Sequence, residues 1–311
     1  MGNLRVAIAA IWLIGAIAAV FYARAQQIPA WVAVPVGIAF LIEISLYATL
    51  GRAVLRKPWQ FLLAALAPYL VYSLATGVFA SKHFLLLLVL CSVLSWWLAL
   101  IPSLDLVFMA VVAAVQITVL YRDLYPPPWP DLKVHVLGHL MLFRTAMGTM
   151  LEFRGDGCGF GFFPGREHWK TGLRYFAYLA PAALAVNWAV GFAQPRLVSG
   201  FWWKAPGTFV GILWVVALGE EFLFRGTLLP RLAQRIGTTW ALIASSIAFG
   251  SVHLWASAFP NWRFAVVAAV AGMFYGWAYL ATGSIRSAMV THALTVTMWR
   301  TFFAIKAGSA L

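Results

Sequence analysis

Long apolar segments follow one another along almost the whole chain, and they restrict the fold more than any other feature. Of the 311 residues, 63% are hydrophobic and only 10% are charged, whereas a soluble globular chain has about 25% charged residues. One soluble core of this length could not enclose so much apolar surface, so lipid must cover the rest. At roughly 20 residues per span, we therefore expect an all-α, polytopic transmembrane helical bundle of about eight to ten spans.

The apolar segments divide the chain into three parts. Residues 1–125 are interpreted as an N-terminal transmembrane module of unknown role, in which the first apolar segment is an uncleaved span rather than a cleaved signal peptide. The proline-rich stretch 126–130 ends any helix there, because proline lacks an amide proton. Residues 126–172 then form an interfacial linker with an amphipathic segment, and residues 173–311 form a second membrane core.

The net charge of +13 would suit a nucleic-acid-binding protein if the chain were soluble. Here the Lys and Arg residues lie mostly between apolar segments, which the positive-inside rule and anionic lipid headgroups explain better. No basic run is interleaved with the stacking aromatic residues that a single-stranded nucleic acid needs. We expect the lipid bilayer, and no nucleic acid, as a partner. The expected location is the cell (inner or plasma) membrane.

The positions of the tryptophans and cysteines restrict the fold and function less than the charges do. Several Trp residues, among them Trp202 and Trp203, lie near the ends of predicted spans, where aromatic belts form. Cys91 lies within an apolar run and Cys158 in a glycine-rich loop, and neither indicates a disulfide framework or a metal cluster.

Ionisable residues inside a membrane are rare and costly, and they mark functional sites by default. One predicted span contains Glu220, Glu221 and Arg225. Glu221 and Arg225 are four residues apart on one helix face, where an ion pair forms readily. Successive helical residues point in different directions, so this pairing leaves Glu220 free to face a cavity as a general base or acid. The alternative is a structural ion-pair cluster that holds helices together.

Two histidines lie within other predicted spans. His253 follows Phe249 by four residues, and His292 lies in the middle of the last span. A lone histidine on an apolar helix is more often a hydrogen-bonded core residue than a catalytic one. Together with Glu220, however, the two imidazoles could converge from separate helices and activate a water, with donors left for an oxyanion. This set would suit the hydrolysis of a peptide bond inside a membrane.

The sequence does not decide the role of three other polar residues within apolar segments. His135 and His139 are four residues apart, but no glutamate follows the first histidine, so the pair is not a zincin motif and a packing or interfacial role is favoured. Glu43 either pairs with an arginine elsewhere or lines a substrate path.

The order and spacing of these motifs resemble the CPBP family, the CAAX proteases and bacteriocin-processing proteins that include the Ras-converting enzyme. The resemblance rests on Glu220-Glu221-x-x-x-Arg225, on Phe249-x-x-x-His253 and on His292, and it covers about residues 160–303. It implies that the core 173–311 is an intramembrane endopeptidase and that its partner is a membrane-associated protein or peptide substrate.

The resemblance also implies roles for single residues. Glu220 and His253 match the pair that activates the attacking water, and His292 matches the histidine that helps to form the oxyanion hole. Glu221 and Arg225 match companion positions that support the site. The family often has an asparagine four residues after the last histidine, where this chain has Val296. Thr295 and Thr297 are the nearby candidates to supply the missing donor.

Cofactor and function alternatives stay open at this point. One carboxylate and two imidazoles match a catalytic zinc set in type, but a metal-free glutamate mechanism needs only the same residues, and we expect no metal and no cofactor. A catalytically inactive scaffold or immunity-type protein of the same fold is the first alternative, because of Val296. A proton-coupled transporter is the second, although Gly/Pro-broken helices in matching halves are not evident.

Overall fold

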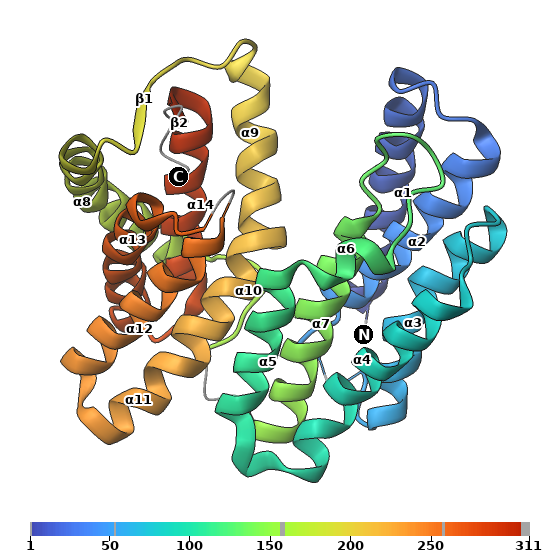
Figure 1. The fold of residues 1–311 in the computed structure, drawn as a ribbon, viewed down its shortest axis with the longest axis horizontal. Helices are drawn as coiled ribbons and strands as arrows, with labels where there is room; N and C mark the ends of the chain where they lie inside the picture. The colour runs from blue at the N-terminus through green and yellow to red at the C-terminus, as the bar shows by residue number, and fades with distance from the viewer. Residues whose placement is uncertain (1, 53, 156–158, 257–258, 306–311) are drawn as a thin grey trace. The chain divides into compact units, whose positions relative to one another are not determined.

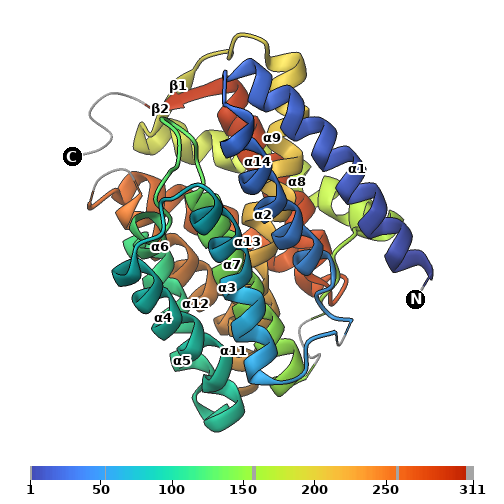
Figure 2. The same ribbon diagram turned by 90° about the vertical axis from the view of Figure 1, so that its right-hand side faces the viewer.

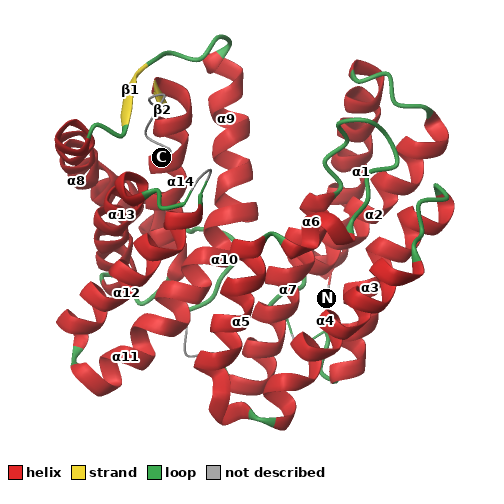
Figure 3. Ribbon diagram, in the orientation of Figure 1, coloured by secondary structure: helices red, strands yellow, loops and turns green. Residues whose placement is uncertain are grey.

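The computed structural model describes residues 2–52, 54–155, 159–256 and 259–305, so Cys158 lies outside the described residues. Contacts divide the chain into two compact units, Met1–Gly155 and Asp156–Leu311. Most described residues are helical, and the strands form one two-stranded sheet (Figures 1 and 3). The expected all-α class is thus confirmed.

The first unit is a helical bundle around α7 (His135–Arg154), which contacts α2 to α6. Figure 2 shows α3, α4 and α7 of this bundle from a second direction. The remaining elements are α1 (Gly2–Ala25), α2 (Ala30–Ala48), α3 (Pro58–Ala75), α4 (Ser81–Leu100), η1 (Pro102–Leu104), α5 (Asp105–Thr118) and α6 (Leu120–Leu124).

A buried ion pair explains why a charged residue is tolerated in the middle of α7. Arg144 is 1% exposed, and its Nε and Nη2 donate to the two carboxylate oxygens of Glu43 at 2.6 and 2.9 Å. Nη2 also donates to the carbonyl oxygen of Ala64 at 3.0 Å. A bidentate pair of this kind has the preferred geometry for arginine and carboxylate. Of the two roles left open for Glu43, the structure thus shows the pairing with an arginine.

The segment expected as an interfacial linker, 126–172, is divided between the two units. Its first helix, α7, is almost completely buried from Leu137 to Met150, whereas residues 166–172 begin α8 of the second unit. The boundary between the two units lies at residue 155. Of the packing and interfacial roles expected for His135 and His139, His139 shows packing, because it lies between Tyr121 and Phe143 and its Nδ1 lies 3.1 Å from Gln116 Oε1.

The second unit is built around α14 (Ile285–Phe302), which contacts α8, α9, α10 and α13 (Figure 1). The Thr291 hydroxyl joins α14 to α8 by donating to the Gly172 carbonyl oxygen at 3.1 Å. The remaining elements are α8 (Arg166–Val190), β1 (Ala193–Pro195), α9 (Phe201–Gly211), η2 (Ile212–Ala217), α10 (Leu218–Glu221), η3 (Phe222–Leu228), α11 (Leu229–Ile236), α12 (Thr238–Val252), η4 (His253–Trp255), α13 (Trp262–Leu280) and β2 (Phe303–Ile305).

Six helices of the described chain are long and apolar enough to cross a membrane: Ile8–Ala25, Ala30–Ala48, Pro58–Ala75, Ser81–Leu100, Phe201–Ile236 and Trp262–Leu280. Helix α12 has only 15 residues, and α14 carries Arg286 and Arg300 within its 18 residues. The eight to ten spans expected from length alone therefore stay a prediction for these remaining helices.

We expect Glu43→Ala to lower the free energy of unfolding by about 3–5 kcal/mol, because it leaves the buried Arg144 charge uncompensated. Thermal unfolding of the detergent-solubilised protein measures the loss. Arg154→Gln is the matched control, since it breaks the pair with Asp105 where Arg154 is 28% exposed; an exposed pair contributes at most about 1 kcal/mol. Equal losses in the two variants would contradict a special role for the buried pair.

Candidate active site

The site is positioned by one long helical stretch that contains two π-helical segments. Residues 201–236 form a continuous helix, in which the π-helical segments η2 and η3 flank the short α10. The Thr227 hydroxyl donates to the carbonyl oxygen of Phe222, five residues earlier, at 3.1 Å. Such π-helical turns are rare in proteins as a whole, but many of those that occur lie at functional sites. They set the directions in which Glu220, Glu221 and Arg225 leave the helix.

Glu221 is the centre of a buried network. Its Oε1 accepts from Arg225 Nη1 at 3.2 Å, the ion pair that the four-residue spacing predicts, and from His292 Nδ1 at 2.8 Å. Both the Glu221 and Arg225 side chains are 0% exposed. Arg225 Nη2 also donates to the Gly272 carbonyl oxygen at 2.9 Å. One carboxylate thus connects three elements, η3, α13 and α14, through partners that compensate its charge.

The orientation of His292 follows from this network. A carboxylate can only accept, so Nδ1 carries the proton that is donated to Glu221. The ring stacks on Tyr275, with centroids 4.7 Å apart and planes 10° from parallel. Nε2 is therefore left to face Glu220, whose Oε2 lies 3.8 Å away. With its Nδ1 fixed, the imidazole has one nitrogen available for chemistry.

Phe249 brings the charged and imidazole groups together. Its ring lies 4.4 Å from the Arg225 guanidinium and has ring contacts with His253 at 4.8 Å and His292 at 5.8 Å. His253 Nδ1 lies 2.8 Å from the Phe249 carbonyl oxygen. Because a carbonyl only accepts, that nitrogen carries the proton and Nε2 is again left available. His253 is close enough to Glu220 and His292 to interact with them electrostatically.

Glu220 differs from its neighbour Glu221 in the way the sequence predicts. Its side chain is 21% exposed, whereas that of Glu221 is 0% exposed. Its Oε2 is buried and has no hydrogen-bond partner among the described residues. The structure thus places Glu220, His253 and His292 close together, with Glu221, Arg225 and Phe249 around them. Oε2 of Glu220 and Oε2 of Glu221 both lack a hydrogen-bond partner among the described residues, but of these two side chains only that of Glu220 is partly exposed.

Two contributors to the site were not found from the sequence. Tyr275 stacks on His292, and Gly272 supplies a carbonyl oxygen to Arg225. Both belong to a buried stripe of α13 with helical spacing, which also includes Ala268, Ala271, Gly276 and Tyr279. That stripe of small and aromatic residues was the available signal, but it is equally typical of ordinary helix packing.

Val296 stands where the family often has an asparagine. Val296 is half-buried. Of the two candidate donors beside it, the Thr295 hydroxyl is already donated to the Thr291 carbonyl oxygen at 2.7 Å. The Thr297 hydroxyl is buried without a hydrogen-bond partner in the described chain. Thr297 is thus the hydroxyl that remains available next to the site.

Among the described residues, no three His, Cys, Asp or Glu side chains are grouped so that they could hold a metal ion. Glu221 and the Nδ1 atoms of both histidines are engaged by protein partners. The expectation of no metal stays a prediction, and the mechanism proposed for the site uses none.

Fold and site together define a polytopic, all-α membrane protein with a glutamate–histidine cluster inside its C-terminal unit. Residues 201–298 match the family model described as type II CAAX prenyl endopeptidase Rce1-like. The match covers less than half of the chain, and for this segment it confirms the resemblance to the CAAX proteases that the motifs carry. No curated protein and no solved structure gives a significant match to the chain.

We expect Gly272→Ala to lower the free energy of unfolding by about 1–3 kcal/mol, the usual cost of overpacking. An added Cβ would lie 2.9 Å from Arg225 Nη2 and 3.3 Å from a ring carbon of Phe249. Thermal unfolding measures the change. Gly211→Ala is the matched control, because no atom lies within 4 Å of its added Cβ. A neutral Gly272→Ala variant would show that the network tolerates displacement of Arg225.

Proposed function

We propose that the protein hydrolyses a peptide bond of a membrane-associated protein or peptide, with Glu220 as the general base. The observation that carries the proposal is the partly exposed Glu220 carboxylate. Its Oε2 has no hydrogen-bond partner among the described residues, and it lies 3.8 Å from Nε2 of His292, whose Nδ1 is hydrogen-bonded to Glu221. A water between this oxygen and the two Nε2 atoms would lose its proton to Glu220 as its oxygen attacks the scissile carbonyl carbon.

The histidines have separate tasks in this mechanism. His253 carries its proton on Nδ1, so its Nε2 accepts a hydrogen bond from the attacking water. His292 lies between the carboxylates of Glu220 and Glu221, which balance the charge of an imidazolium. In that form its Nε2–H donates to the oxyanion that develops on the scissile carbonyl oxygen. Proton transfer from Glu220 to the leaving amine completes the hydrolysis.

The membrane environment supports the same assignment. Phe222 and Phe249 around the cluster are almost completely buried, and a dry site strengthens the interaction between Glu220 and a developing charge. The match to a CAAX endopeptidase family supports peptide-bond hydrolysis as the class of reaction. We propose the cell membrane as the location of the protein and a membrane-embedded or membrane-surface segment as its substrate.

An inactive scaffold of the same fold is the second candidate. One observation favours it: where the family often has an amide, this chain has Val296, and the adjacent Thr295 hydroxyl is donated to its own helix. A weaker oxyanion hole would lower the rate, since the loss of one donor typically costs about a hundredfold or more.

The first test compares cell-envelope peptides from cells that express the wild type or Glu220→Gln at equal levels. We expect new peptide termini only with the wild type, because removal of a general base lowers the rate by about 10²–10⁴-fold. Proteomics of termini identifies the cleaved protein in the same experiment. Matching profiles from the two strains would favour the scaffold.

Glu221→Gln separates catalysis from structure. We expect it to lower the free energy of unfolding by about 3 kcal/mol or more, because the buried Arg225 loses its counter-charge. Glu220→Gln should change stability by less than about 1 kcal/mol, since its carboxylate has no cationic partner as close as Arg225 is to Glu221. Thermal unfolding of both purified variants measures the difference, and equal destabilisation would contradict the division of roles.

A further inference from the structure

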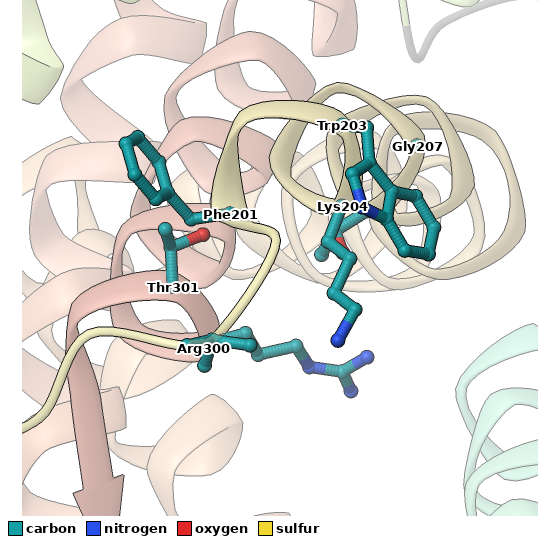
Figure 4. Close-up of a pocket in the computed structure, with 8 residues that line it drawn as sticks. Phe201, Trp203, Lys204, Gly207, Arg300 and Thr301 are labelled. Atoms are coloured by element: carbon teal, nitrogen blue, oxygen red, sulfur yellow. The ribbon is translucent and has the colours of Figure 1, made fainter.

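A pocket of about 430 Å³ lies at one end of the second unit, away from the residues of the candidate active site. Figure 4 shows it between the start of α9 and the end of α14. A chain segment after β1 closes one side, because Arg196 and Val198 donate their N–H groups to the carbonyl oxygens of Phe302 and Thr301. Arg300 is eight residues after His292 on α14, about 12 Å further along the helix axis.

Two basic side chains line this pocket, Lys204 from α9 and Arg300 from α14. Both are exposed, and Figure 4 shows them extending on the same side of the pocket. Lys204 Nζ lies 5.3 Å from the ring of Trp203, another lining residue. Neither cation makes an ion pair or a side-chain hydrogen bond among the described residues. Two unpaired cations at one pocket favour an anionic ligand.

The described residues of the second unit offer no carboxylate beside these two cations. The second unit contains three described acidic residues. Glu220 and Glu221 belong to the candidate active site, and Glu167 lies at the opposite end of α8 from β1. Within the described second unit, Lys204 and Arg300 therefore lack a counter-charge, and an anion from outside this unit can supply it.

The surroundings of the pocket indicate an amphiphilic anion. Phe201, where a candidate membrane span begins, is a lining residue. Trp202 and Trp203 are 74% and 57% exposed, as residues of an aromatic belt at headgroup level are. Farther along α9, Val210 is 49% exposed and offers apolar surface for an acyl chain. Basic pockets between the ends of membrane helices are suited to phospholipid head groups.

We propose that this pocket binds the phosphate of an anionic phospholipid between Lys204 and Arg300, with the acyl chains along the exposed apolar face of α9. The Thr301 carbonyl oxygen accepts a hydrogen bond from the segment after β1, so the backbone next to Arg300 is held in place. The site is separate from the proposed catalytic residues, and the proposal does not depend on peptidase activity.

Native mass spectrometry of the full-length protein in a nonionic detergent tests the proposal. The probes are short-chain phosphatidylglycerol and phosphatidylcholine with identical chains. We expect Lys204→Gln/Arg300→Gln to weaken phosphatidylglycerol binding about thirtyfold, from the contribution of two basic residues at a lipid surface. Phosphatidylcholine binding should change less than twofold. Both substituted residues are exposed and unpaired, so the variant is expected to fold, which its thermal unfolding checks.

The matched control is Lys170→Gln/Arg174→Gln, which removes the same charge from exposed positions on α8. It should bind phosphatidylglycerol as the wild type does. Equal weakening in both double variants, or none in Lys204→Gln/Arg300→Gln, would overturn the proposal. Inorganic phosphate and a peptide with a free C-terminal carboxylate are added as competitors. Displacement of the lipid by either at a similar concentration would identify a phosphate or peptide site instead.

Discussion

Each unit of this protein has a buried arginine, and each arginine depends on one glutamate. An uncompensated charge inside an apolar bundle is strongly destabilising, whereas a paired and hydrogen-bonded charge is tolerated. Glu43 and Arg144 meet this requirement in the first unit with two hydrogen bonds. Glu221 and Arg225 meet it in the second, where a backbone carbonyl from α13 completes the arrangement. The helices around each pair are positioned by this need.

The two pairs differ in what they leave free. In the first unit the glutamate uses both oxygens on one arginine. In the second, Glu221 divides its Oε1 between Arg225 and His292, which fixes the imidazole and directs its other nitrogen toward Glu220. A structural charge pair therefore also orients an imidazole. The adjacent Glu220 carboxylate is not needed as the counter-charge of Arg225, because Glu221 already forms that ion pair.

Local spacing predicted one of these pairs and could not predict the other. Glu221 and Arg225 are one helical turn apart, so their contact follows from helix geometry even where the winding becomes π-helical. Glu43 and Arg144 are 101 residues apart, and no periodicity connects them. For this reason the sequence left the partner of Glu43 open, and it left a packing or an interfacial role open for the histidines of α7. Similarly, the packing of Tyr275 on His292 depends on how α13 and α14 meet.

The sequence by itself determined the all-α membrane class, the Glu-Glu-x-x-x-Arg and Phe-x-x-x-His motifs and the pairing of Glu221 with Arg225. These features depend on composition and on contacts within one helical turn, which are local. Only the tertiary structure decided that α7 is the centre of the first unit and that Glu221 holds His292. It also decided that Lys204 and Arg300 share one pocket. Such contacts join residues far apart in the chain, and the packing of whole helices sets them.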